Sequence, residues 1–258
     1  MSNPKSNDHV LALHGANGVG KTRLAHGLAE ALDLPIKTIN LGSINDLSYF
    51  TAHGFTFVDS EPGRIVQILS ELQIKNCIVY FDELDKIHHT EKGQAIFAYL
   101  THLIDPTQNK KYQDTYLSGL ELDMSSIFFI FSFNDENMID KTVKDRLKII
   151  KIKEPSFKDK ILISEKFIIP EISKNVNYNV PIPRSVVERV VQQDKTFSGM
   201  CGIKRVIEDI ISKLNVIRML DASGRQKISF YNESISNTID NIINAHEEPE
   251  MFSSSLYC

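Results

Sequence analysis

The stretch Val10–Thr22, VLALHGANGVGKT, decides how the rest of the chain folds. Mostly apolar residues lead into Gly15, and four residues later comes Gly20-Lys21-Thr22, the spacing of a phosphate-binding loop between a strand and a helix. Glycines at positions 15, 18 and 20 lack a Cβ, so the backbone can take positive φ and turn its N–H groups toward an anion. The residues predicted to bind the phosphates of a nucleotide are Gly15, Ala16, Asn17, Gly18, Val19, Gly20, Lys21 and Thr22.

Two side chains of this loop have predicted roles of their own. Lys21 supplies a charge that reaches the β and γ phosphates, and the Thr22 hydroxyl is a ligand for Mg²⁺. A helix predicted over residues 21–32 points the positive end of its dipole at the same anion. Nucleotide and Mg²⁺ are therefore expected together at the start of this helix.

Composition bounds the class of protein. The 258 residues suffice for one ordinary domain and a smaller one, and the 42% hydrophobic content is that of a soluble globular protein. A net charge of −4 and a pI near 6.1 give no electrostatic reason to expect nucleic acid as a bulk partner. The three cysteines lack C-x-x-C spacing, which predicts neither a disulfide framework nor a zinc site. No apolar run reaches the ~18 residues of a membrane span, and the first residues lack a signal-peptide core, so we expect an intracellular, cytoplasmic protein without a membrane partner.

Strands and helices alternate up to about residue 153. Apolar runs predict strands at 10–14, 36–40, within 77–86, at 127–133 and at 149–152, and helical spacing predicts helices over 21–32, 62–75, 93–104 and 140–147. Ser60 is the expected cap of the second helix, with Pro62 in its first turn. Residues 107–125 are predicted to form a loop with short β-like pieces around 116–122. The alternation predicts an α/β fold, a doubly wound parallel P-loop NTPase sheet with helices on both faces, in a domain over residues 1–154.

Past Pro155 the pattern becomes helical only. Helices are predicted over 157–168, 184–194 and 202–220, in a small all-helical domain over residues 155–222. The remaining residues, 223–258, are polar and weakly patterned, and we expect a loosely attached tail with one short helix near 235–245.

Acidic and amide side chains follow the buried strands. Asp82 and Glu83 end an apolar run, and because ligands of open α/β sheets bind at the carboxyl ends of strands, both should converge with Lys21. Asp82 would hold Mg²⁺, and Glu83 would polarise the water that attacks the γ-phosphate. Asn134 ends another strand and could orient that water, although an ordinary turn asparagine is the alternative.

Two further features are less distinctive taken singly. Arg146 is either a surface helix residue or an arginine finger given to a neighbouring subunit. His88 and His89 are adjacent in a loop, and because adjacent side chains point in different directions, we interpret them as solvated and not as metal ligands.

With Asn134 and Arg146 at their spacings, the set of motifs resembles the AAA+ ATPases, in particular the ATPase module of Lon-type proteases. The similarity extends from about Val10 to Leu220. The segments that carry it are EPGRIVQIL (61–69), FDELDK (81–86), DPTQNKKYQDTYL (105–117), VKDRLKIIKI (143–152) and KFIIPEI (166–172). They are similar, in turn, to the segment after the family's first pore loop, its Walker B segment, its DP-x-QN segment, its arginine-finger segment and a helix end.

The resemblance implies roles for further residues. In the same register, Phe57 and Val58 fall where the family carries the aromatic and aliphatic pair that grips an unfolded polypeptide in a central pore. Lys204 stands where the family has its second-sensor arginine, so the charge is kept and the planar fork is lost unless Arg205 replaces it.

The function implied by the resemblance is that of an ATP-binding and ATP-hydrolysing module that uses Mg²⁺ and has a helical lid domain. It would work as a ring-shaped homo-oligomer, typically a hexamer, that unfolds or remodels a polypeptide. The family's adenine-packing element and N-terminal region would precede the first strand, where only about nine residues stand, and a peptidase domain would have to follow Leu220. We therefore expect the chain not to be a protease itself. It would act as a motor alone or as the motor half of a split system, in which a separate peptidase chain would be its partner.

Two alternatives stay open. A nucleic-acid-associated ATPase, such as a loader or initiator, would use a basic face around Lys141, Lys144, Lys148 and Lys151. A regulatory module that does not hydrolyse ATP would fit the missing adenine element and Lys204. The acidic pI and the predicted pore pair favour a polypeptide over nucleic acid.

Overall fold

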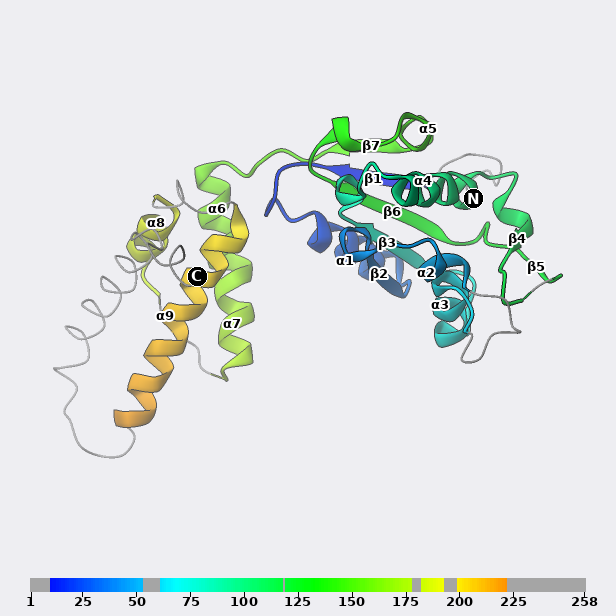
Figure 1. Cartoon of the computed structure of the whole chain (residues 1–258). Helices are drawn as coiled ribbons and strands as arrows, with labels where there is room; N and C mark the ends of the chain where they lie inside the picture. Colours follow the sequence, from blue (N-terminus) through cyan, green and yellow to red (C-terminus); the bar gives the residue numbers. More distant parts are fainter. Residues whose placement is uncertain (1–9, 53–60, 118, 178–181, 193–198, 222–258) are drawn as a thin grey trace, which may run out of the picture. The chain divides into compact units, whose positions relative to one another are not determined.

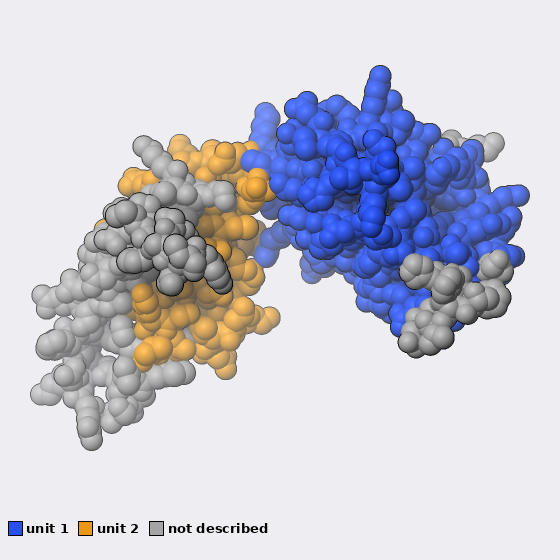
Figure 2. Space-filling model, in the orientation of Figure 1, with its two compact units in different colours: residues 1–16, 20–153 blue, residues 17–19, 154–258 orange. Residues whose placement is uncertain are grey.

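The computed structural model describes residues 10–52, 61–117, 119–177, 182–192 and 199–221, the last five by their backbone only. These residues form two compact units, one of residues 1–16 and 20–153 and the other of residues 17–19 and 154–258 (Figure 2). Three residues of the phosphate-binding loop thus group with the second unit. Within the described part of the chain, no helix combines the length and the apolar character that crossing a membrane requires.

The first unit is built on a parallel sheet of five strands in the order β2-β3-β6-β1-β7 (Figure 1). The strands are β1 (Val10–His14), β2 (Ile36–Asn40), β3 (Ile78–Asp82), β6 (Phe128–Phe133) and β7 (Lys148–Lys151), and a separate small antiparallel pair is formed by β4 (Tyr112–Gln113) and β5 (Glu121–Leu122). The helices of this unit are α1 (Lys21–Leu32), α2 (Ser48–Thr51), α3 (Arg64–Leu72), α4 (Glu91–Ile104) and α5 (Lys141–Lys144). The predicted α/β class and parallel sheet are confirmed.

Both faces of the sheet are covered because successive strand residues point to opposite sides. On one face Ile78 and Tyr80 of β3 pack with Ala25 and Ala29 of α1. On the other face the main core includes residues of α3 and α4 and a run of aromatic rings, among them Phe81, whose ring stacks on that of Phe131 with centroids 4.9 Å apart. The central strands β3 and β6 are buried on both sides and are continuous apolar runs, as the sequence indicated.

The second unit is helical and has its own core. Its helices are α6 (Phe157–Ile163), a π-helical turn (Ser164–Ile168), α7 (Ile169–Asn175), α8 (Arg184–Gln192) and α9 (Met200–Asp221). Ser156 caps α6 in a reciprocal capping box with Asp159. The apolar faces meet around Ile161, Val187 and Ile207. The predicted tail and its short helix lie outside the described residues, and the boundaries at 155–222 and 223–258 stay predictions.

Two predicted helices have other bounds in the structure. The helix expected over 62–75 covers Arg64–Leu72: it begins after Gly63, its N-cap, which donates its backbone N–H to Asp114 Oδ2 at 3.0 Å, and it ends before Gln73, whose backbone is left-handed. The helix expected to end at Ile168 continues as α7, because a π-helical turn precedes Pro170, which then falls in the first turn of α7 where no N–H is needed. Smaller differences concern α4, which begins at Glu91 behind the cap Thr90, and the strand and helix ends near residues 127, 140, 147 and 152.

Gly63 is expected to be essential for the first unit. A Cβ added there would lie 1.8 Å from the carbonyl oxygen of Phe50 and 2.6 Å from Asp114 Oδ2, so the backbone must shift. Gly63→Ala should lower the free energy of unfolding by about 3 kcal/mol in urea titrations followed by circular dichroism. Gly27→Ala is the matched control, since Gly27 is exposed on α1 and nothing lies within 4 Å of its added Cβ, and it should raise the free energy of unfolding by about 0.5–1 kcal/mol. Equal effects of the two substitutions would contradict the packing argument.

Candidate functional site

The phosphate-binding loop joins β1 to α1. Gly18 and Gly20 have φ of 74° and 95°, the left-handed region in which residues other than glycine are strained. Gly15 is not among the described glycines of positive φ, so that part of the prediction was wrong. Its N–H instead bonds the carbonyl of Phe133 at 3.3 Å, which continues the pairing of β1 with β6.

Lys21 is the first residue of α1 and is 9% exposed. Its ammonium donates to the carbonyls of Gly15 at 2.7 Å and Ala16 at 2.9 Å and to Asn134 Oδ1 at 2.6 Å. Burial lowers the pKa of Lys21, and the nearby carboxylates of Asp82 and Asp85 oppose that shift. The lysine is thus a nearly buried cation held among oxygen acceptors at the carboxyl ends of β1 and β6.

A second group of oxygens lies around Asp82 at the end of β3. Thr22 Oγ1 donates to Asp82 Oδ2 at 3.4 Å and lies 3.2 Å from the Tyr80 hydroxyl. The Tyr80 hydroxyl donates to Asp82 Oδ1 at 3.1 Å, and the Ser132 hydroxyl donates to the same oxygen. Burial raises the pKa of Tyr80 to about 12, so its hydroxyl stays a donor near neutral pH. The structure brings together Thr22 and Asp82, the two predicted Mg²⁺ ligands.

Glu83 follows Asp82 in a left-handed backbone conformation, with φ 61° and ψ 46°. Its N–H bonds Asp82 Oδ1 at 3.1 Å, whereas its carboxylate lies against the turn after β2, where a Cβ added to Gly42 would be 2.6 Å from Glu83 Oε2. A Cβ at this position would therefore displace the end of the Glu83 side chain. Asp82 and Glu83 are therefore adjacent in sequence, but their carboxylates lie in different surroundings.

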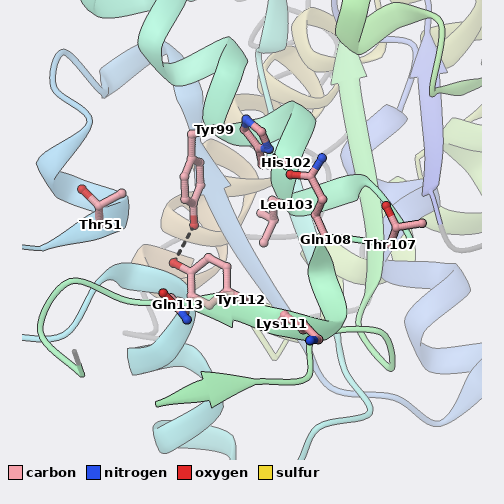
Figure 3. Close-up of a pocket in the computed structure, with 9 residues that line it drawn as sticks. All are labelled: Thr51, Tyr99, His102, Leu103, Thr107, Gln108, Lys111, Tyr112 and Gln113. Atoms are coloured by element: carbon pink, nitrogen blue, oxygen red, sulfur yellow. Dashed lines mark hydrogen bonds between the residues drawn. The ribbon is translucent and has the colours of Figure 1, made fainter. Parts of the chain in front are cut away.

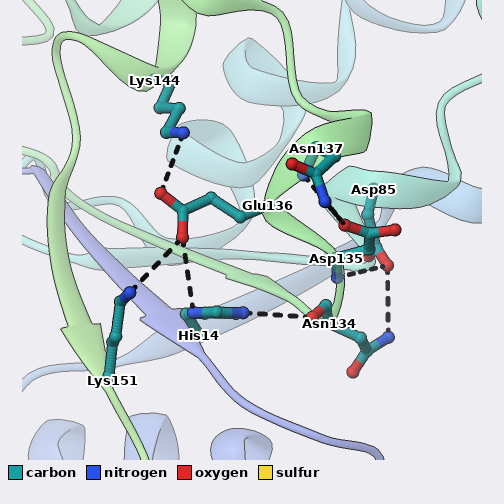
Figure 4. Close-up of polar contacts among 8 residues, drawn as sticks. All are labelled: His14, Asp85, Asn134, Asp135, Glu136, Asn137, Lys144 and Lys151. Atoms are coloured by element: carbon teal, nitrogen blue, oxygen red, sulfur yellow. Dashed lines mark hydrogen bonds and ion pairs between the residues drawn. The ribbon is translucent and has the colours of Figure 1, made fainter.

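Asn134 follows β6 and contacts both the loop and the segment after β3. Its Oδ1 accepts from Lys21. Its Nδ2 donates to Asp85 Oδ2 at 3.4 Å (Figure 4). The carbonyl of Asn134 lies 3.1 Å from His14 Nε2, and the other ring nitrogen of His14 faces Glu136 at 3.8 Å. Asn134 thus contacts Lys21 directly, and its predicted role of orienting the attacking water stays a prediction.

Arg146 lies apart from these residues, between α5 and β7. Its guanidinium donates to the carbonyl of Thr142 at 2.9 Å and forms an ion pair of 3.6 Å with Asp105. The side chain is 40% exposed. Its described contacts are with its own helical turn and the end of α4, and none is with Lys21, Thr22, Asp82 or Asn134.

The other predicted residues are not placed at the site. Lys204, in α9 of the second unit, donates to Glu171 Oε1 of α7 at 2.9 Å. Phe57 and Val58 lie outside the described residues. His88 and His89 are exposed, and among the described residues no group of three metal-binding side chains is close enough to hold an ion. Lys204 and the pore pair stay predictions.

A cavity of about 410 Å³ lies elsewhere in the first unit (Figure 3). Its walls come from α2, the last turns of α4 and the segment leading into β4, and the hydroxyls of Tyr99 and Tyr112 meet at 3.0 Å on one side of it. None of the predicted nucleotide-binding residues lines it. The loop and the strand ends, and not this cavity, form the candidate functional site.

Comparison with known proteins decides the family. The model of the ATPase family associated with various cellular activities (AAA) matches residues 11–154. The chain belongs to the AAA family. That match contains the phosphate-binding loop, the acidic end of β3, Asn134 and Arg146, and AAA membership implies that the loop binds ATP.

The curated relatives of this AAA chain include Lon proteases. It is 33% identical over 222 residues to the Lon protease homolog of Acanthamoeba polyphaga mimivirus. This alignment covers 84% of the chain and 22% of the viral protein. It is 34% identical over 212 residues to the Lon protease of Campylobacter concisus, and this alignment covers 81% of the chain and 26% of the bacterial protein. It is 31% identical over 223 residues to the mitochondrial Lon protease homolog of Debaryomyces hansenii, and this alignment covers 84% of the chain and 20% of the yeast protein. The resemblance to the Lon ATPase region is confirmed, and the chain spans between a fifth and about a quarter of these relatives' lengths.

Sequence reasoning missed four residues around the AAA site, namely Gly42, Tyr80, Asp85 and Ser132. For two of these residues the sequence contains a pattern that could have identified them. Tyr80 stands two residues before Asp82, on the same face of β3, and Ser132 is a hydroxyl inside the otherwise apolar run IFFIFSF. Gly42 and Asp85 gave no comparable signal, because their contacts depend on how β2, β3 and β6 align.

Proposed function

We propose that this AAA chain hydrolyses ATP and uses the energy to unfold or remodel polypeptides as a subunit of a ring. The observation that carries the proposal is the meeting of Lys21, Thr22, Asp82 and Asn134 at the ends of three adjacent strands. Phosphoryl transfer needs mainly positioning and charge stabilisation, and these groups supply a cation, oxygen ligands and an amide in one place.

The contacts of these residues support a role for each of them. Phosphate oxygens would replace the carbonyls of Gly15 and Ala16 as acceptors of the Lys21 ammonium. The Thr22 hydroxyl and the Asp82 carboxylate are adjacent hard oxygens that fit Mg²⁺, which when bound would neutralise phosphate charge. Glu83 would accept the proton of the attacking water, which requires its side chain to turn away from Gly42.

Lys21→Ala is expected to weaken ATP binding about 100-fold, because a charge-assisted contact to the phosphates is lost. The measurement is a titration with a fluorescent ATP analogue. Lys92→Ala, which removes a lysine 70% exposed and paired with Asp46 on the surface, is the matched control and should bind as the wild type does. An unchanged affinity in Lys21→Ala would remove the loop from the proposed site.

A polypeptide is the proposed substrate because the relatives named above are proteases and the pore pair Phe57-Val58 is predicted from the same resemblance. The basic face of the nucleic-acid alternative is partly neutralised, since Glu136 pairs with Lys144 at 2.8 Å and with Lys151 at 3.7 Å. The ATPase rate should rise with protein concentration and with added casein, an unfolded protein. Stimulation by double-stranded DNA and not by casein would favour the nucleic-acid-associated ATPase, and no hydrolysis at any concentration would favour the regulatory module.

A further inference from the structure

Asp85 is a buried acid that the proposed reaction has not used. It lies in a 3₁₀ turn (Leu84–Lys86) three residues after Asp82 and is 6% exposed. Its Oδ2 accepts from Asn134 Nδ2 at 3.4 Å and from the backbone N–H of Asp135 at 3.2 Å, whereas its Oδ1 is buried without a hydrogen-bond partner among the described residues. Burying an acid with so few partners costs free energy, so a purely structural role is a poor explanation of its presence.

The two neighbours of Asn134 determine which way its amide faces. An ammonium can only donate, and an ionised carboxylate can only accept. Between Lys21 and Asp85, the amide satisfies both only with its oxygen toward the lysine and its nitrogen toward the acid, which is the orientation observed. Figure 4 shows the bond from the amide nitrogen to Asp85. The acid thus fixes the direction of the amide, and although its charge also acts on Lys21, it forms no hydrogen bond with the phosphate-binding residues that the structure describes.

We infer that Asp85 is a positioning residue that makes Asn134 present its oxygen, and not its NH₂ group, to the reacting phosphate and water. When phosphate takes over the Lys21 ammonium, the freed oxygen of Asn134 accepts a hydrogen bond from the attacking water. Asp85 also connects two strand ends, because its other contact, the N–H of Asp135, fixes the backbone just after β6. The kinetic consequence rests on the proposed hydrolysis, while the orientation of the amide does not.

The orientation is tested in the wild-type protein by nuclear magnetic resonance. The side-chain N–H signals of Asn134 are identified by their loss in Asn134→Ala. We expect one of them to be shifted downfield and to exchange slowly with water, to lose both properties in Asp85→Asn and to keep them in Asp135→Asn. Asp135 is the matched control, since it is the neighbouring exposed acid and its side chain accepts from Asn137 instead. Free exchange of both Asn134 protons in the wild type would overturn the inference without any variant.

The kinetic test is a double-mutant cycle. Asp85→Asn should lower kcat about 10- to 100-fold, the range for one hydrogen bond to a charged group, with KM for ATP changed less than about threefold. In an Asn134→Ala background the same substitution should have a much smaller effect on kcat, because the amide that it positions is gone and only its contact with Asp135 and its charge near Lys21 change. Losses that multiply in the double variant would overturn the positioning role. If the wild type does not hydrolyse ATP, the proposed function fails, and the amide signals still decide whether Asp85 orients Asn134.

Discussion

Glu83→Gln is expected to bind ATP as the wild type does and to hydrolyse it about 10²–10⁴ times more slowly, the usual contribution of a general base. The amide keeps the size of the side chain and its fit against Gly42, but it cannot accept a proton from water. ATP affinity is measured by titration and turnover by phosphate release. Glu30→Gln, on the exposed face of α1, is the control for a change from acid to amide and should leave both quantities unchanged.

The geometry of Glu83 makes this variant informative in a second way. The left-handed backbone at φ 61° is a strained conformation for a glutamate, of the kind that structures retain where a side chain must be aimed. In the described structure the carboxylate is aimed at the turn after β2, so the active arrangement requires a rotation of the side chain. If Glu83→Gln turned over at the wild-type rate, neither this rotation nor Glu83 itself would belong to the mechanism.

The sequence sufficed for the fold and for the centre of the site because both depend on local patterns. The loop spacing from Gly15 to Thr22 and the apolar runs of β3 and β6 are readable without knowledge of distant contacts. Since parallel strands end at the same edge of a sheet, the approach of Asp82 to Lys21 followed from the order of the elements, whereas the carboxylate of Glu83, expected there too, lies against the turn after β2.

What could not be predicted depends on contacts between residues far apart in the chain. The start of α3 is set by the bond of Gly63 to Asp114, 51 residues later. The partnership of Ser132 with Asp82 depends on register, because β3 and β6 pair Phe81 with Phe131 and so place the next residues side by side. The bond from Asn134 to Asp85 likewise spans 49 residues, so no local pattern indicates it.

Arg146→Ala is expected to lower the ATPase rate about 10³-fold or more, because an arginine finger stabilises charge in the transition state of a neighbouring site. In the structure the Arg146 side chain is held only weakly, as expected if it must move to reach a neighbouring subunit. The ion pair with Asp105 is long at 3.6 Å and partly exposed, and pairs of that kind contribute about 0–1 kcal/mol. The pKa of Asp105 is lowered chiefly by its bonds to Thr107, with Arg146 a minor cause, so the acid loses little when the guanidinium departs. Arg146 should therefore be able to reach across a subunit boundary.

Mixing two inactive variants tests whether Arg146 acts on the site of a neighbouring subunit. In a mixed ring, an intact finger from a Glu83→Gln subunit can serve the intact site of an Arg146→Ala neighbour, so part of the activity should return when the two are combined. The matched control combines Arg146→Ala with the double variant Arg146→Ala/Glu83→Gln, in which no subunit supplies a finger, and should stay inactive. If sedimentation shows mixed oligomers and no activity returns, Arg146 acts within its own subunit or not at all. If no oligomer forms with ATP at any concentration, the ring itself is wrong, and a regulatory AAA module becomes the better account of a site that still places Lys21, Thr22, Asp82 and Asn134 together.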